Sequence, residues 1–237
     1  MINELVILAA GNSKRMGDLG KKYSKPGVPV KNKPLLFHVI KPYLKLGITK
    51  IHLVLNPKNE WLASEIKTKI SREVSIDHVI QKLQNGSGDA IRLALPLIKT
   101  DDIFLCACDN ILTYNGLKKL AKKHLSKKPE ATLSLIKDKK EKILEGSTVK
   151  LGNENRLLKI IEKPKQDEIL SNYGVVMSHV INFNFLRSLS FNHTLREGIE
   201  LDFMTELAKK IETSKIYGVK IRKRINITYP EDLKKIR

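Results

Sequence analysis

Cysteine and long apolar runs are the two scarcest features of this sequence. Its 237 residues include two cysteines, no apolar run of membrane-spanning length and no secretory leader pattern. Cys106 and Cys108 lie two positions apart on an expected strand, so they point to one face and do not favour a disulfide. We therefore expect a cytoplasmic protein with no membrane partner, in which both thiols are small buried hydrophobes.

Aromatic and acidic residues are also few. Aromatics make up 5% of the chain, and 25 acidic residues face 44 lysines and arginines, which gives a net charge of +19. A basic excess of this size favours nucleic acid as a partner. The basic residues are nevertheless spread along the chain, as in Lys118-Lys119 and in 220–224, and few aromatics are available for base stacking. We expect no nucleic-acid partner, and a basic RNA-associated module remains an alternative.

Strand and helix patterns alternate along the first half of the chain. This alternation predicts an α/β fold with a doubly wound, mostly parallel sheet in one domain, 1–237. After Pro129 several strands follow with few helices between them, which indicates a small sheet-rich lobe and divides the chain into halves of about 1–128 and 129–237. The expected strands are 4–8, 48–55, 75–80, 102–108, 131–136, 147–151, 156–162 and 173–182, and the expected helices are 36–46, 87–98, 116–125 and 200–210.

A small-residue turn follows the first apolar strand, and two cations come soon after it. The turn can expose backbone N–H groups as an anion-binding nest, and Arg15 and Lys25 can add positive charge. An ordinary turn with two solvated cations is the alternative for this motif taken alone. The turn positions that we expect to bind a triphosphate are Leu8, Ala9, Ala10 and Gly11.

A second glycine-flanked loop joins the strand 75–80 to the helix 87–98. Gln81 begins this loop, and Gly86 and Ser87 lie where the helix begins. A helix N-terminus presents free N–H groups to a ligand, so the loop is a candidate nucleotide-binding element. The alternative is a serine N-cap flanked by glycines, which has no binding role.

One carboxylate stands at the end of a buried strand. Asp109 follows the strand 102–108, where it can anchor a hard cation. Mg²⁺ needs only one or two protein oxygens when phosphates and waters complete its shell. A turn or N-cap role is the alternative for an isolated aspartate.

Taken in order, these motifs resemble the nucleotidyltransferases that make nucleotide sugars. That family opens with a Leu-Ala-(Gly/Ala)-Gly turn, an arginine, a Lys-Pro, a second Lys-Pro-Leu, a helix and a Gly-Ile. The matching elements here are Leu8 to Gly11, Arg15, Lys25-Pro26, Lys33-Pro34-Leu35 and Gly47-Ile48, and Cys108-Asp109-Asn110 and Asn226 to Leu233 match two later motifs.

The resemblance implies a Rossmann-like fold of the nucleotide-diphospho-sugar transferase type with a small acceptor-binding lobe. It implies Mg²⁺ as cofactor, an NTP and a phosphorylated sugar or polyol as substrates, and nucleotide binding in the half 1–128. Arg15 and Lys25 would be catalytic, Gln81, Gly86 and Ser87 would face the base, and Asp109 and Asn226 would hold the metal. The acceptor would contact Gly146, Glu162, Lys163 and Asn172. A homo-oligomer remains open.

Two alternatives stay open within this resemblance. The opening motif is shared with cytidylyltransferases that act on methylerythritol phosphate, phosphocholine or inositol-1-phosphate, whereas Glu162-Lys163-Pro164 is closer to the sugar branch. Ser13 replaces the second glycine of the usual turn, and Asn226 replaces a carboxylate. Those two departures favour a catalytically silent, nucleotide-sensing relative, whereas the retained Arg15, Lys25 and Asp109 count against it.

Overall fold

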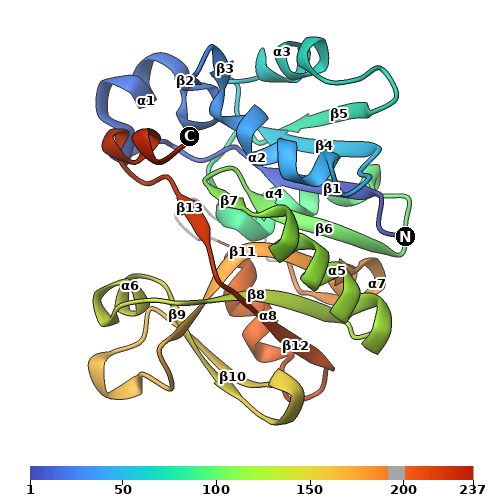
Figure 1. Ribbon diagram of the computed structural model, residues 1–237, viewed down its shortest axis with the longest axis vertical. Helices are drawn as coiled ribbons and strands as arrows, with labels where there is room; N and C mark the ends of the chain where they lie inside the picture. The colour runs from blue at the N-terminus through green and yellow to red at the C-terminus, as the bar shows by residue number, and fades with distance from the viewer. Residues whose placement is uncertain (192–200, 237) are drawn as a thin grey trace.

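A single seven-stranded sheet forms the centre of the molecule, and helices pack on both of its faces (Figure 1). The computed structural model describes residues 1–191 and 201–236. The strands are β1 Glu4–Leu8, β2 Pro29–Val30, β3 Lys33–Pro34, β4 Lys50–Leu55, β5 Ser75–Ile80, β6 Asp102–Ala107, β7 Asn110–Leu112, β8 Ala131–Lys137, β9 Ser147–Leu151, β10 Leu157–Glu162, β11 Tyr173–Asn182, β12 Ile216–Ile221 and β13 Arg224–Asn226. The helices are α1 Gly17–Tyr23, α2 Leu35–Leu44, α3 Leu62–Lys69, α4 Gly86–Ala94, α5 Tyr114–Lys127, α6 Lys140–Glu145, α7 Phe183–Ser188 and α8 Phe203–Lys209.

The sheet is mostly parallel, as the alternation of strands and helices predicts. Its order is β12-β8-β11-β6-β1-β4-β5, and β11 pairs antiparallel with both of its neighbours while the other pairs are parallel. The central strand β1 is buried along most of its length, with Leu5 paired to Ile51 on one side and Phe104 on the other. Aliphatic runs of this kind are typical of strands covered on both faces.

Two hydrophobic cores lie on opposite faces of the sheet. One core contains Leu36 and Ile40 of α2 with Leu117 of α5, and α3 adds to it. The other contains Ile91 of α4 and Phe203 of α8, and α7 adds to it. The sheet is therefore wound on both faces, which confirms the predicted fold class.

The predicted sheet-rich second half differs in detail from the structure. Of its four expected strands, β8 and β11 join the central sheet, and only β9 and β10 form a separate antiparallel ribbon. Strands β12 and β13 are additional to the predicted strands, and the basic run 220–224 covers the end of the first and the start of the second. Lys220 lies on the edge strand β12, where one side of the strand faces solvent.

The C-terminal segment crosses back to the N-terminal half. Strand β13 pairs with β7, and the following 3₁₀ helix, Pro230–Lys235, lies beside α1 (Figure 1). Ile227 and Ile236 are buried against Met16 and Val28 in a small third core. This segment therefore supports the loop that carries Arg15 and Lys25.

The remaining expectations concern the cysteines, the helix 200–210 and membrane spans. Both cysteines are free and buried, as expected. Helix α8 begins at Phe203, and position 200 lies outside the described residues. Across 1–191 and 201–236, every helix falls short of the length and apolarity needed to cross a bilayer.

Candidate active site

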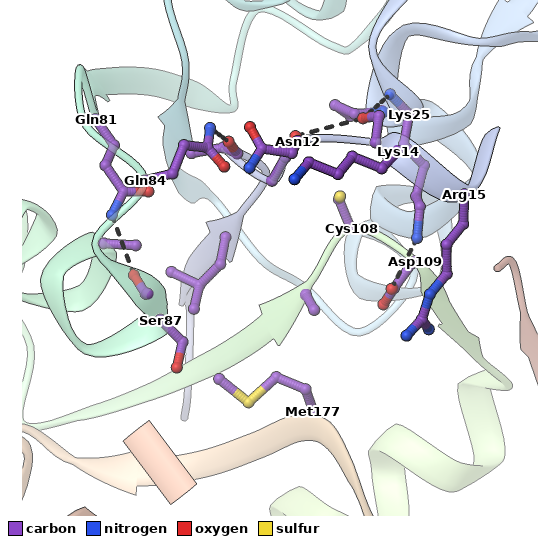
Figure 2. A pocket seen from close by; sticks show the side chains of 18 of the residues that line it. Asn12, Lys14, Arg15, Lys25, Gln81, Gln84, Ser87, Cys108, Asp109 and Met177 are labelled. Atoms are coloured by element: carbon purple, nitrogen blue, oxygen red, sulfur yellow. Dashed lines mark hydrogen bonds and ion pairs between the residues drawn. The ribbon is translucent and has the colours of Figure 1, made fainter. Parts of the chain in front are cut away.

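A cavity of about 580 Å³ opens at the carboxyl ends of β1 and β6, beside the N-terminus of α4. This edge of an open α/β sheet is where such folds bind ligands. Residues from four separate motifs of the sequence meet around it (Figure 2). The predicted site residues that line the cavity are Leu8, Ala10, Gly11, Arg15, Lys25, Gln81, Gly86, Ser87 and Asp109.

Ala9 lies beneath the N-terminal turn and does not line the cavity. It is fully buried, its N–H donates to Val54 O at 2.8 Å, and its carbonyl accepts from Asn59 Nδ2 at 2.9 Å. Asn56 Nδ2 donates to the next carbonyl, that of Ala10, at 3.1 Å. Two buried side-chain amides that follow β4 therefore fix the turn through its carbonyl groups. Neither Asn56 nor Asn59 was predicted from the sequence.

Ser13 stands where the related turn carries glycine, and it occupies a conformation that glycine favours. Its φ is 56°, in the left-handed region. Its hydroxyl accepts the backbone N–H of Lys25 at 2.6 Å and donates to Gly11 O at 3.3 Å. The serine thus ties the turn to the segment that carries the lysine.

Lys25 and Asp109 form an ion pair at one end of the cavity. Lys25 Nζ lies 3.1 Å from Asp109 Oδ2 and donates to Ile227 O, also at 3.1 Å. The Lys25 side chain is 16% exposed and that of Asp109 is 31% exposed, so the pair is partly shielded but reachable. Asp109 Oδ1 accepts from Asn110 Nδ2 at 2.7 Å, and Arg15 extends beside this pair (Figure 2).

The opposite end of the cavity is built by the loop before α4. Gln81 and Gln84 line it, and Gln84 Nε2 donates to the carbonyl of Ala10. Gly86 has a φ of 89°, and a Cβ there would lie 2.5 Å from the carbonyl oxygen of Leu201. A residue with a side chain would therefore be strained at this turn.

Asn226, the second predicted metal ligand, is the last residue of β13. It pairs with Asn110 across the β7–β13 ribbon, and Ile227 N donates to Asp109 O at 2.9 Å. Asn226 Nδ2 donates to Thr228 Oγ1 at 3.0 Å, which leaves Oδ1 as the oxygen that can bind a cation. The residue lines a neighbouring cavity of about 950 Å³, not the 580 Å³ one.

A carboxylate and an amide oxygen are hard ligands of the kind that Mg²⁺ binds. In the described part of the chain, no three His, Cys, Asp or Glu side chains form a preassembled metal site. The donor set therefore fits a cation that draws most of its shell from phosphates and water, and Asp109 would be its anchor.

The predicted acceptor residues lie apart from the lining of the main cavity. Lys163 N donates to Gly146 O at 2.6 Å, so these two residues and Glu162 lie together at the β9–β10 ribbon. Asn172 lines a different cavity of about 280 Å³. Three of the four acceptor residues thus lie together, and the segment of Asn172 packs on the same ribbon, because Ser171 O accepts from Thr148 Oγ1 of β9 at 3.0 Å.

Glu162 lies near Asp202, which lines the cavity and caps α8 by accepting from Thr205 N at 2.9 Å. Burial raises the pKa of the Glu162 carboxyl to about 7, the Asp202 carboxylate raises this pKa too, and the Lys163 ammonium lowers it. The bond to Thr205 N is that of an N-cap. The place of Asp202 in the lining was not predicted, nor were the places of Asn12, Lys14, Gln84, Met177 and Met204.

Residues 4–199 match the family model described as nucleotidyl transferase. The chain belongs to this nucleotidyl transferase family. The match confirms the resemblance that the order of motifs predicts.

Individual relatives are distant in sequence and close in fold. The chain is 27% identical over 224 residues to the bifunctional protein GlmU of Methanococcus vannielii, which covers 92% of this chain and 50% of that protein. The chain thus spans about half the length of the GlmU proteins that it matches. A UTP-bound UGPase from Acinetobacter baumannii superposes with a TM-score of 0.83 at 18% identity, covering 99% of this chain and 92% of that one. The inositol-1-phosphate CTP transferase of T. maritima superposes with a TM-score of 0.80 at 21% identity. This match covers 98% of this chain and 91% of that one.

Proposed function

We propose that this protein transfers a nucleoside monophosphate from an NTP to a sugar-1-phosphate-like acceptor and releases pyrophosphate. The observation that carries the proposal is the shared cavity, in which the small-residue turn, Arg15, Lys25, the Gly86 loop and Asp109 meet. A glycine turn, a helix N-terminus and two cations suit the phosphates of a nucleotide. A relative from Methanocaldococcus jannaschii, 24% identical and named as a putative UTP–glucose-1-phosphate uridylyltransferase, supports a uridine nucleotide, and the Glu162-Lys163 motif on the β9–β10 ribbon favours the sugar branch.

The chemistry needs alignment and charge neutralisation more than proton transfer. An oxygen of the acceptor phosphate, already anionic at neutral pH, attacks the α-phosphorus in line as the bond to the β-phosphate oxygen breaks. Pyrophosphate leaves with the bonding electron pair, and no proton has to be removed from the nucleophile. We assign Lys25 to the charge that develops on the α-phosphate and Arg15 to the β- and γ-phosphates that leave.

We propose Mg²⁺ as the cofactor, held by Asp109 with Asn226 Oδ1 as a neutral second ligand. When bound, the ion would neutralise charge on the triphosphate. Lys25 Nζ occupies one Asp109 oxygen at 3.1 Å, so a cation on that oxygen would compete with the ammonium, which would then be free to meet the phosphates. This exchange of partners would deliver the ammonium to the α-phosphate.

The acceptor half extends over about 129–237 in this proposal. Glu162 would accept hydrogen bonds from acceptor hydroxyls, and Lys163 would hold the acceptor phosphate. Gly146 lies beside Lys163, where its backbone can approach the acceptor, and Asn172 would contact the acceptor from the segment that precedes β11.

Pyrophosphate release tests the proposal directly. The purified protein would be assayed with UTP, dTTP, CTP, ATP and GTP against a panel of sugar phosphates and polyol phosphates, with and without Mg²⁺. We expect Mg²⁺-dependent release with at least one pair and a nucleotide-linked product of matching mass. Release with inositol-1-phosphate or phosphocholine alone would instead support the polyol branch. Nucleotide binding without release from any pair would support the silent, nucleotide-sensing relative.

A further inference from the structure

The side-chain amide of Gln81 is held in one orientation by two acceptors. Gln81 is 4% exposed, and its Nε2 donates to Gly86 O at 3.1 Å and to Asp89 Oδ2 at 2.9 Å. A carbonyl and an ionised carboxylate can only accept, so the group that faces them must be the NH₂. Both of its hydrogens are used by these two bonds, and Oε1 remains for a ligand.

Asp89 is itself fixed on the first turns of α4. Its side chain is 4% exposed, and Oδ1 accepts from Arg92 Nη2 at 2.8 Å and from Arg92 Nε at 3.2 Å. The two nitrogens of the guanidinium bind one oxygen, which leaves the other oxygen for Gln81. A guanidinium only donates, so its pairing with this carboxylate is consistent with Asp89 acting as the acceptor toward the amide.

The free oxygen of Gln81 faces the nucleotide cavity. Gln81 belongs to the lining, and Figure 2 shows its oxygen on the side toward the middle of the pocket while its nitrogen turns to Gly86. If the amide were flipped, Oε1 would meet both Asp89 Oδ2 and Gly86 O. Two such contacts between acceptors would leave buried groups unpaired, which makes the flipped state unfavourable.

We propose that Asp89 is a positioning residue that makes Gln81 a fixed hydrogen-bond acceptor and thereby selects the base. The assignment rests on the function proposed above. A fixed acceptor pairs with the N3–H of uracil or thymine. Cytosine places an unprotonated N3 at the same position, so two acceptors meet there. The selected substrates are therefore nucleotides whose pyrimidine carries a proton on N3.

The ratio of kcat/KM for UTP to kcat/KM for CTP tests the role of Asp89. We expect the wild-type protein to favour UTP, and Asp89→Asn to lower the ratio at least about tenfold, the effect of one buried hydrogen bond. Arg92 would still donate to the oxygen of the new amide at position 89, so the NH₂ group of that amide would face Gln81. Gln81 Nε2 would then lose its acceptor, and the Gln81 amide would no longer be fixed in one orientation. Asp101→Asn is the matched control, because it removes the same charge from an exposed position before β6 and should leave the ratio within twofold.

Arg92→Ala provides a second variant should Asp89→Asn fail to fold. Loss of the guanidinium frees the Asp89 side chain to rotate. We therefore expect the UTP/CTP ratio of kcat/KM to fall, by a smaller factor than in Asp89→Asn. A purely structural role for Asp89 would lower kcat/KM for UTP and CTP equally and leave the ratio unchanged. That outcome, or a wild-type preference for CTP, overturns the inference.

Binding without an acceptor separates this inference from the proposed function. Dissociation constants for UTP and CTP would be measured by calorimetry with Mg²⁺ present and no acceptor. A UTP preference that Asp89→Asn abolishes supports the inference even if no acceptor gives pyrophosphate, in which case only the transfer function fails. Equal affinities in the wild-type protein would overturn the inference while leaving transfer intact.

Discussion

Lys25 shows how closely the chemistry of this site depends on single side chains. Its Nζ is shared between the carboxylate of Asp109, which follows β6, and a carbonyl of the C-terminal segment, each at 3.1 Å. These two contacts hold the ammonium at the lining of the cavity, beside Asp109. At this scale the protein places charge by contacts between segments more than eighty residues apart.

Replacing either member of this pair should nearly abolish turnover. We expect Lys25→Ala and Asp109→Ala each to lower kcat for pyrophosphate release at least about a hundredfold, because a positioned charge of this kind contributes a few kcal/mol to the transition state. Steady-state kinetics measure the effect, and circular dichroism checks the fold. Lys21→Ala is the control, since the Lys21 side chain is 82% exposed. Rates close to wild type in both variants would contradict the mechanism.

The acceptor site should respond to pH through Glu162. Burial, with Asp202 nearby, raises the pKa of this carboxyl to about 7, so it loses its proton as the pH rises through 7. The ionised form accepts hydroxyl protons better, and we expect the acceptor KM to fall severalfold between pH 6 and pH 8. Glu162→Gln should flatten this dependence.

The control separates Glu162 from the acceptor phosphate, whose own second ionisation lies near pH 6. Glu141→Gln changes an exposed carboxylate on α6 and should keep the wild-type profile. A wild-type profile in Glu162→Gln as well would assign the pH dependence to the phosphate and not to the glutamate.

Strands were easier to predict than helices in this protein. The expected strands 4–8, 75–80, 147–151 and 173–182 have the bounds of β1, β5, β9 and β11, and most are rich in β-branched residues. Helix α1 was missed because none of its residues is buried, so it carries no apolar periodicity. Strand β12 was missed because its lysine and the basic residues after it resemble a solvated face.

The site divides in the same way. The motifs that follow β1, β5 and β6 could be placed together from sequence, since parallel strands end at one edge of a sheet. Other hydrogen bonds could not be predicted from local sequence patterns. Asn56 and Asn59 donate to the turn after β1, and Gln81 donates to Asp89. Their partners are fixed only once the strands are packed.

The N-termini of α4 and α8 are joined by reciprocal side-chain bonds. Asp202 caps α8 and accepts from Ser87 Oγ at 3.2 Å, while Ser87 Oγ accepts from Phe203 N at 2.9 Å. We expect Asp202→Ala to lower the free energy of unfolding by about 1 kcal/mol, the usual cost of a lost N-cap. The corresponding Tm shift, about 2 to 4 °C, is measurable by calorimetry. Asp101→Ala should leave Tm unchanged, and an equal loss there would refute the capping explanation.

At the scale of the whole molecule, the free energy of unfolding should depend on pH through a buried histidine. His179 on β11 is fully buried, and neither ring nitrogen has a hydrogen-bond partner among the described residues. Burial lowers its pKa to about 3. The unfolded chain takes up a proton below about pH 6.5 and the folded chain does not, so stability is lost as the pH falls from 6.5 toward 3.

Urea denaturation at pH 7 and pH 5 measures this loss. His179 should account for about 2 kcal/mol between the two values, since each proton contributes about 1.4 kcal/mol per pH unit below the unfolded pKa. We expect His179→Leu to remove that part of the loss. His78→Gln, at a position 37% exposed, should retain it. Equal pH dependence in wild type and His179→Leu would show that the acid sensitivity originates elsewhere.

The C-terminal segment returns from β13 to the loop near α1, so part of the N-terminal half can complete its packing only late in synthesis. Met16 and Val28 gain their apolar cover from Ile227 and Ile236, and Lys25 finds a carbonyl acceptor at residue 227. A ribosome-bound chain that has not yet released these residues can form β1 and β4 but leaves the loop without its support. The loop that carries Arg15 and Lys25 therefore gains its full support only after residue 236 has left the exit tunnel, when every strand of the central sheet has been synthesised.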